Sequence, residues 1–139
     1  MGARLMVRRP DWPARLADYI ETRRRRVFSW GDNDCAMFAA DWVVEAAGWD
    51  PAAAVRGRYT TAVGARRVLK NRAGGDLEAF VDGQLPVIEQ AYAGRGDLML
   101  FAMPDGPALG VCLGTVCACP GETGLVFLPV TSALKAWGV

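Results

Sequence analysis

Apolar residues in the first part of the chain recur every three or four positions, which is the spacing of an amphipathic helix. This pattern predicts helices over about 11–26, 34–47, 60–71 and 77–81. Gly48 follows the second of them, and a glycine at that place commonly ends a helix in the left-handed conformation. The wide apolar stripe of the second helix indicates a central element that other elements cover.

The last part of the chain changes to short, nearly continuous apolar runs bounded by glycine and proline. Such runs are typical of strands, and they lie at about 97–103, 109–113, 115–119 and 125–130. Helices followed by an antiparallel meander predict the α+β class. We expect one domain over residues 1–139, with N-terminal helices packed on a small antiparallel β-sheet.

Composition narrows the functional classes. The 139 residues are 52% apolar and 22% charged, with a formal net charge of +1. This balance is that of a globular protein, and it gives no reason to expect a nucleic-acid partner. No stretch is long and apolar enough to predict a membrane span, so membrane insertion is not expected. The basic run at 23–26 is interpreted as the solvated last turn of the first helix, with an acidic partner as the alternative.

The residues around Cys35 carry the strongest chemical signal. A Gly-Asp-Asn-Asp cluster at 31–34 breaks the chain, and a helix begins directly after it. Cys35 is therefore expected in the first turn, where unpaired backbone N–H groups and the helix dipole stabilise a thiolate. A cysteine nucleophile also needs a base within hydrogen-bond reach, and the chain contains no histidine. Cys35 is thus either a nucleophile with an unusual base or a small buried residue, with a redox or acylated thiol as a further alternative.

Two acidic residues near Cys35 are expected to have structural roles. Asp34 is expected to cap the helix, because its carboxylate can accept hydrogen bonds from the orphan N–H groups there. Asp41 lies six residues beyond Cys35 and faces away from it. We expect Asp41 to fix the following loop by pairing with Arg56 or Arg58.

The remaining cysteines, Cys112, Cys117 and Cys119, raise the alternative of a metal site together with Cys35. Their spacing lacks the Cys-X-X-Cys knuckle of common zinc sites. We therefore expect no metal and no cofactor, and we interpret these side chains as small residues that pack on strands.

Three tryptophans are candidate partner contacts. Trp30, Trp49 and Trp137 lie beside turns or close to the end of the sequence, and aromatic side chains at such places suit a protein interface. A sugar-binding cleft and a place in the core are the alternatives for these residues.

One loop with an unusual composition is a second candidate contact. Arg56, Arg58 and Tyr59 lie within four residues of one another, and arginine and tyrosine in a loop suit a partner surface. The alternative is that the loop is held onto the preceding helix through Asp41 or Glu45.

Three segments of the sequence resemble the papain-like cell-wall peptidases of the NlpC type. Asp34-Cys35 and the apolar helix after them resemble the nucleophile helix of that family. Residues 95–101, Arg-Gly-Asp-Leu-Met-Leu-Phe, resemble its strand entry, and residues 108–114, Ala-Leu-Gly-Val-Cys-Leu-Gly, resemble the strand that normally begins with the catalytic histidine. The resemblance implies a papain-like core with Cys35 at the nucleophile position and Ala108 at the position of the missing histidine.

A second resemblance covers nearly the whole chain. Residues 30–42, Trp-Gly-X-X-Asp-Cys-X-X-Phe-X-X-Asp-Trp, are similar to the opening of small proteins of unknown function from tailed phages and prophages. The Asp-Pro at 50–51, the Arg-Gly-X-Tyr at 56–59 and the Ala-Trp at 136–137 extend this similarity. Such proteins are similar to the peptidase-like component encoded beside tail-tip genes in siphophages and gene transfer agents.

The two resemblances together imply a structural, catalytically inactive, peptidase-like component of a tail tip. Its partners would be other tail proteins, such as the hub and distal tail proteins, and it would reside in the virion tail after assembly in the host cytoplasm. The alternative is a cell-wall cysteine peptidase or amidase that acts on peptidoglycan through Cys35 and an unusual or partner-supplied base. A host-binding or regulatory module that kept the fold is the third interpretation.

Overall fold

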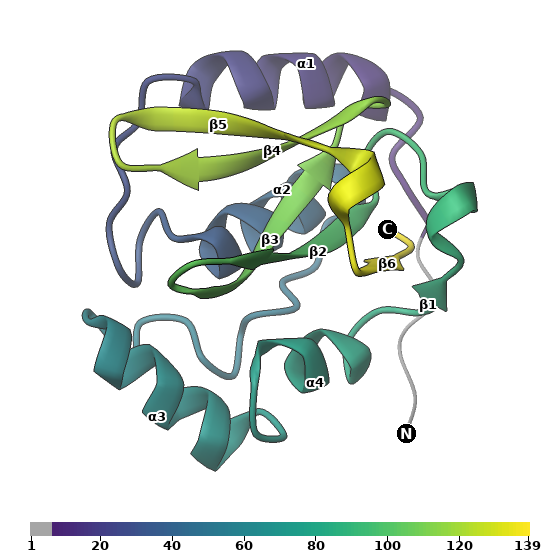
Figure 1. Ribbon diagram of the computed structural model, residues 1–139. Coiled ribbons are helices and arrows are strands. Elements are labelled where there is room, and N and C mark those ends of the chain that lie inside the picture. The colour runs from purple at the N-terminus through teal and green to yellow at the C-terminus, as the bar shows by residue number, and fades with distance from the viewer. Residues whose placement is uncertain (1–6) are drawn as a thin grey trace.

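A computed structural model describes residues 7–139 of the protein, and helices precede strands along the chain (Figure 1). The helices are α1 (Trp12–Arg23), α2 (Cys35–Ala47), α3 (Ala62–Arg72) and α4 (Leu77–Asp82). The strands are β1 (Val87–Ile88), β2 (Leu98–Met103), β3 (Gly106–Cys112), β4 (Val116–Gly121), β5 (Gly124–Pro129) and β6 (Lys135–Trp137). Short 3-10 turns, η1 (Gln90–Tyr92) and η2 (Val130–Ser132), complete the list.

The strands form one antiparallel sheet in the order β1-β6-β2-β3-β4-β5. The four strands that the apolar runs predict are β2 to β5, and they form the expected meander. The sequence analysis missed β1 and β6, which pair with each other at one edge, while β6 also pairs with β2. These strands have two and three residues, so they are too short to show an alternating pattern.

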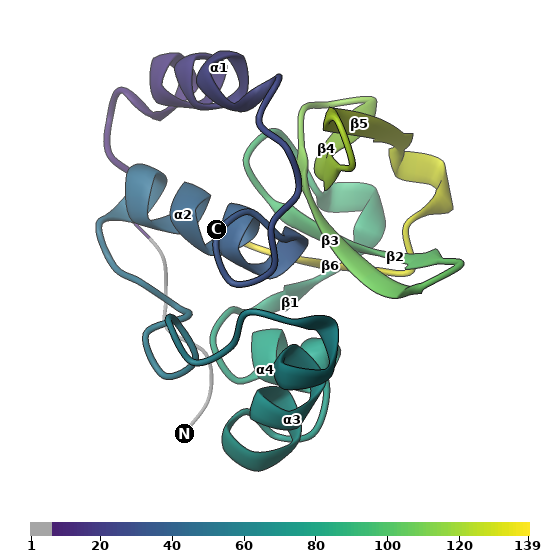
Figure 2. The same cartoon turned by 90° about the vertical axis from the view of Figure 1, so that its left-hand side faces the viewer.

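The central helix, α2, ends at the predicted residue and begins one residue after the predicted start. The Asp34 carboxylate accepts a hydrogen bond from the backbone N–H of Met37 at 2.8 Å, as an N-cap does. Gly48 ends the helix with φ +79°. Figure 2 shows α1 beside α2 and the pair α3 and α4 on the other side of α2. The fold thus places the start of α2 between the sheet and the α3–α4 pair.

The first helix departs from the prediction at both ends. Asp11 occupies the N-cap position, but its carboxylate accepts a hydrogen bond from Arg15 at 2.8 Å and caps no backbone N–H group. The helix ends at Arg23, three residues earlier than its predicted end at residue 26. The basic run at 23–26 therefore extends beyond the helix, with Arg24 bound to Glu21 and Arg26 to Asp32.

Buried side chains form three clusters that α2 and the sheet separate. The main core lies between α1, α2 and one face of the sheet, and it includes Leu16, Tyr19, Phe38, Trp42, Leu100, Val111 and Trp137. A second cluster joins α2 to the following loop and α4 through Met37, Ala40, Ala52, Val55 and Phe80. A third covers the opposite face of the sheet with Met99, Phe101, Cys112, Cys117 and Ala136.

Candidate functional site

Asp34 organises the turn that leads into α2. It is 1% exposed, and its carboxylate accepts hydrogen bonds from the backbone N–H groups of Gly31 and Met37, both at 2.8 Å. The hydroxyl of Tyr59 donates a third at 2.6 Å. The prediction that Asp34 caps α2 is confirmed, and the three donors identify it as a residue that positions the turn.

Tyr59 and Gly31 fix the candidate loop against this turn. Gly31 has φ +83°, and a Cβ atom added there would overlap the carbonyl oxygen of Tyr59, so only glycine fits this close approach. Burial, followed by the hydrogen bond to Asp34, raises the pKa of the Tyr59 hydroxyl above its ordinary value. Tyr59 therefore stays neutral and holds the loop to the start of α2.

Cys35 is the first residue of α2 and is half-buried. Burial of its sulfur raises the pKa of the thiol to about 11; the backbone N–H of Leu109 in β3 lowers it, and the adjacent Asp34 carboxylate raises it. The expectation that the helix N-terminus yields a stabilised thiolate is therefore wrong for this site, because desolvation outweighs the favourable N–H groups. At neutral pH, Cys35 is a protonated thiol.

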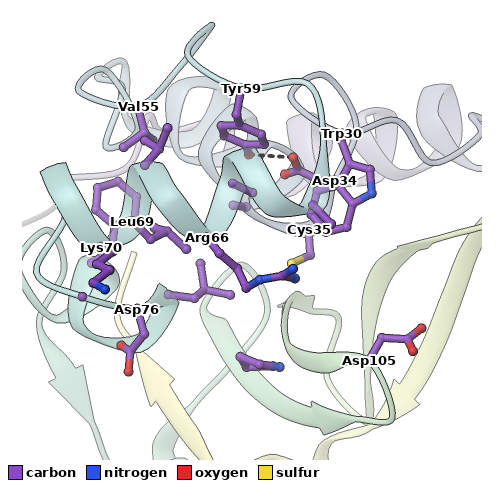
Figure 3. A pocket seen from close by; sticks show the side chains of 18 residues that line it. Trp30, Asp34, Cys35, Val55, Tyr59, Arg66, Leu69, Lys70, Asp76 and Asp105 are labelled. Carbon is purple, nitrogen blue, oxygen red and sulfur yellow. Dashed lines mark hydrogen bonds between the residues drawn. The ribbon is translucent and has the colours of Figure 1, made fainter.

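A cavity of about 380 Å³ lies beside Cys35 (Figure 3). Its walls come from the start of α2, from the α3–α4 pair and from the turn between β2 and β3, and they are mainly apolar. Representative apolar lining residues are Trp30, Val55, Ala62, Leu69, Phe80 and Pro107. The cavity can therefore accommodate an apolar group next to the thiol.

The carboxylates at this cavity are poorly placed to activate the thiol. Asp34 is engaged by three donors, and Asp76 caps α4 by accepting from the backbone N–H of Ala79 at 2.8 Å. The Asp105 carboxylate points away from Cys35 (Figure 3). The lining also contains Arg66 and Lys70 of α3, whose side chains are hydrogen-bond donors.

Ala108 lies in β3 directly before Leu109, whose backbone faces Cys35. Its register partner in β2 is Phe101, and the Phe101 side chain belongs to the cluster on the sheet face away from α2. Because cross-strand partners share a face, the Ala108 side chain lies on that face too. Ala108 is half-buried and is not among the cavity-lining residues.

The predicted pairing of Asp41 is confirmed for one of the two arginines. Arg56 contacts Asp41 at 2.7 Å and Asp50 at 2.8 Å. Burial raises the pKa of Asp50, but the hydrogen bond and charge of Arg56 together with the backbone N–H of Ala52 outweigh it, so that this pKa lies below its ordinary value. Arg56 thus pins the loop onto α2, whereas Arg58 is exposed.

The three tryptophan candidates occupy different environments. Trp30 is 41% exposed at the cavity and stacks edge-on against Phe28 at 4.9 Å. Trp49 is half-buried against the main core. Trp137 is 0% exposed, and its indole N–H donates to Asp82 at 2.9 Å. The interpretation of Trp137 as an interface residue is therefore wrong, because β6 carries it into the core.

Sequence reasoning missed the walls that α3 and α4 contribute. Arg66, Leu69 and Lys70 of α3 and Phe80 of α4 line the cavity, although the apolar residues of α3 follow no clear stripe in the sequence. Only the tertiary arrangement brings these helices opposite Cys35. Within residues 7–139, no three His, Cys, Asp or Glu side chains come together in a way that could hold a metal ion.

A family described as "Domain of unknown function (DUF6950)" matches residues 7–139. The chain belongs to this family. The family description gives no activity, and no curated protein matches the chain in sequence. Within the described part of this DUF6950 member, no helix is long and apolar enough to cross a membrane.

A solved structure shows what this fold is similar to. It is the crystal structure of the NlpC/p60 domain of the peptidoglycan hydrolase SagA, with 17% sequence identity and a TM-score of 0.51. The match covers 92% of this chain and 96% of the other. The predicted α+β, papain-like fold of the NlpC type is thereby confirmed for this DUF6950 member, and the likeness shows the fold alone.

Proposed function

We propose that the protein is a catalytically inactive, peptidase-like component of a tail tip in a phage or gene transfer agent. Its partners would be other tail proteins, including hub and distal tail proteins, which it contacts in the virion tail after assembly in the host cytoplasm. The proposal combines the NlpC-type fold with the similarity of the whole sequence to small tailed-phage proteins.

The protonated thiol of Cys35 is the observation that supports the proposed lack of catalytic activity. A cysteine peptidase needs a thiolate and a base that can return the proton to the leaving amine. Here burial raises the pKa of the thiol to about 11, and the sequence contains no histidine. Loss of a general base alone lowers a rate by roughly 10²–10⁴-fold.

The cavity beside Cys35 supports a role in binding. An apolar hollow of about 380 Å³ can bury one large apolar side chain of a neighbouring protein, and such buried anchors dominate protein interfaces. Exposed Trp30 stands at this cavity and offers further contact area. We therefore propose that the contact with other tail proteins lies at the cavity beside Cys35.

Filling the cavity tests this placement. Ala62 is half-buried and lines the cavity, whereas the next residue of α3, Val63, is 56% exposed. Ala62→Trp should exclude a partner side chain and lower incorporation of the chain into purified tails, while Val63→Trp should incorporate normally. Equal incorporation of both folded variants would contradict the placement.

Gene replacement in the producing bacterium tests the structural role itself. We expect Cys35→Ala to support tailed particles at the wild-type titre, with the chain detected in the purified tails by mass spectrometry. Deletion of the gene should abolish functional tails. Particles that assemble normally without the chain, or a defect of Cys35→Ala as severe as the deletion, would contradict the proposal.

A second candidate is a cell-wall cysteine peptidase or amidase completed by another chain. The observation in its favour is that Cys35 lines an open cavity, so a histidine from a partner could reach the thiol from outside. Such a partner should lower the pKa of Cys35 and enable peptidoglycan hydrolysis by the complex. Cys35-dependent hydrolysis by assembled tails would therefore favour this candidate.

A further inference from the structure

Cys112 and Cys117 are opposite each other in the hairpin of β3 and β4. They are register partners, and both have 0% exposure and free thiols. Their side chains lie in the same cluster on the sheet face away from α2. Because cross-strand register partners share a face of the sheet, the two thiols are neighbours.

The hairpin geometry favours a covalent bond at this pair. The next pair toward the turn is joined by the backbone hydrogen bond from Leu113 N–H to the carbonyl of Val116, at 2.7 Å. In an antiparallel ladder the pair beside a hydrogen-bonded pair is a non-hydrogen-bonded one, whose Cα atoms are only about 4.5 Å apart. This separation falls within the range of roughly 4.4–6.8 Å that a disulfide spans.

The surroundings also single out which sulfur reacts first. The backbone N–H of Gly114 donates to the Cys112 sulfur, at 3.4 Å. The interaction between the two neighbouring thiols is the main cause that lowers the pKa of Cys112 and raises the pKa of Cys117. Cys112 is therefore the better thiolate and the better initial nucleophile.

We propose that Cys112 and Cys117 form a reversible dithiol–disulfide site, whose oxidant is a low-molecular-weight disulfide such as oxidised glutathione. This inference does not depend on the proposed function. It gives the hairpin that holds Leu109 against Cys35 a covalent lock in an oxidising environment.

The exchange proceeds in two displacements. Because both thiols are buried, the first displacement requires local opening of the hairpin. The Cys112 thiolate then attacks one sulfur of glutathione disulfide, forms a mixed disulfide and expels a glutathione thiolate with the bonding electron pair. The Cys117 thiolate then attacks the Cys112 sulfur and expels the second glutathione thiolate. The protein pair loses two electrons and two protons, and one glutathione disulfide becomes two thiols.

The test uses the folded wild-type chain in glutathione redox buffers. We expect the number of free thiols to fall from four to two, with tandem mass spectra linking Cys112 to Cys117. Because the fold holds the sulfurs together, the disulfide should form at a lower fraction of oxidised glutathione in native buffer than in guanidinium. Because the folded state favours the disulfide, the oxidised protein should also have a higher Tm than the reduced protein.

Two variants keep the test decisive. Cys35→Ala/Cys119→Ala retains the pair and should oxidise as the wild-type protein does, whereas Cys117→Ser should retain all its remaining thiols. Linkage of Cys112 to Cys119, or oxidation that occurs in guanidinium but not in native buffer, would overturn the proposal. Failure of Cys117→Ser to fold would leave the wild-type and double-variant results to decide it.

Discussion

At the scale of single residues, the start of α2 depends on one buried carboxylate. Asp34 accepts from two backbone N–H groups and from the Tyr59 hydroxyl. Its removal leaves these donors without their acceptor in a largely buried site. Removal of the Tyr59 hydroxyl alone takes away only one of the three hydrogen bonds.

Substitution of these residues should therefore have graded effects. Asp34→Ala is expected to lower the free energy of unfolding by about 2–4 kcal/mol, and Tyr59→Phe by about 1–2 kcal/mol. Urea denaturation of both variants checks the order. If Tyr59→Phe lowered the free energy of unfolding as much as Asp34→Ala does, the assignment of Asp34 as the central acceptor would be contradicted.

Cys35 should react with alkylating reagents only at high pH. Burial keeps its thiol protonated until the pH approaches about 11, whereas an unfolded cysteine ionises near about 8.5. Iodoacetamide labelling followed by peptide mapping should give a rate that rises toward pH 11 in the native protein and near pH 8.5 in guanidinium. A native rate that is already maximal at pH 7 would indicate an activated nucleophile.

The same shift has a consequence for stability. As the pH rises, the unfolded thiol loses its proton first and the folded one only near pH 11. The contribution of Cys35 to stability is therefore present below about pH 8.5 and is lost as the pH rises toward 11. Cys35→Ala should remove this part of the alkaline destabilisation.

Residue-scale prediction from the sequence succeeded where local chemistry decides. The cap by Asp34 and the pairing of Asp41 with Arg56 follow from residue type and spacing, and both are present. The predicted ionisation of Cys35 was wrong because the desolvation that raises its pKa comes from the tertiary fold. The apolar walls from α3 and α4 were missed for the same reason.

At the scale of elements, β6 shows how tertiary pairing overrides a local pattern. Its three residues lie between β1 and β2, and they bring Trp137 to the core with a hydrogen bond to Asp82. The longer helices and the four strands of the meander carry repeated apolar signals, so the sequence predicts that they exist and in which order, while some of their ends differ by two or three residues. Two- and three-residue strands carry no such signal.

Substitution of one buried and one exposed tryptophan tests whether β6 carries Trp137 into the core. Trp137→Phe should lower the free energy of unfolding by about 1–3 kcal/mol, because it leaves a cavity and removes the donor to Asp82. Trp30→Phe, at a side chain that is 41% exposed, should change it by less than about 0.5 kcal/mol. Thermal or urea unfolding of the pair checks the result, and equal effects would contradict the core position of Trp137.

At the scale of the whole molecule, Arg8 joins segments that are far apart in sequence. Its guanidinium donates to the carbonyls of Arg95 and Val139 at 2.8 and 2.7 Å and to the Asp97 carboxylate at 2.8 Å. Asp97 also accepts from the backbone N–H groups of Gly94 and Val139. This network ties the segment before α1 to the residues that precede β2 and follow β6.

Loss of this network should destabilise the whole fold. We expect Arg8→Ala to lower the free energy of unfolding by about 2–4 kcal/mol, because it leaves the largely buried Asp97 carboxylate without its cation. Arg25→Ala, at an exposed arginine, serves as the control and should have little effect. Matching unfolding curves for the two variants would show that the network contributes nothing.

The most direct test of the proposed inactivity is peptidoglycan hydrolysis by tails assembled with wild-type or Cys35→Ala chains. Release of stem-peptide fragments is measured by mass spectrometry of the soluble products at neutral pH. We predict that the two preparations release the same amount, because the Cys35 thiol is protonated and the chain has no histidine to act as its base. Release that occurs with wild-type tails and disappears with Cys35→Ala would contradict the account and establish an active cysteine hydrolase.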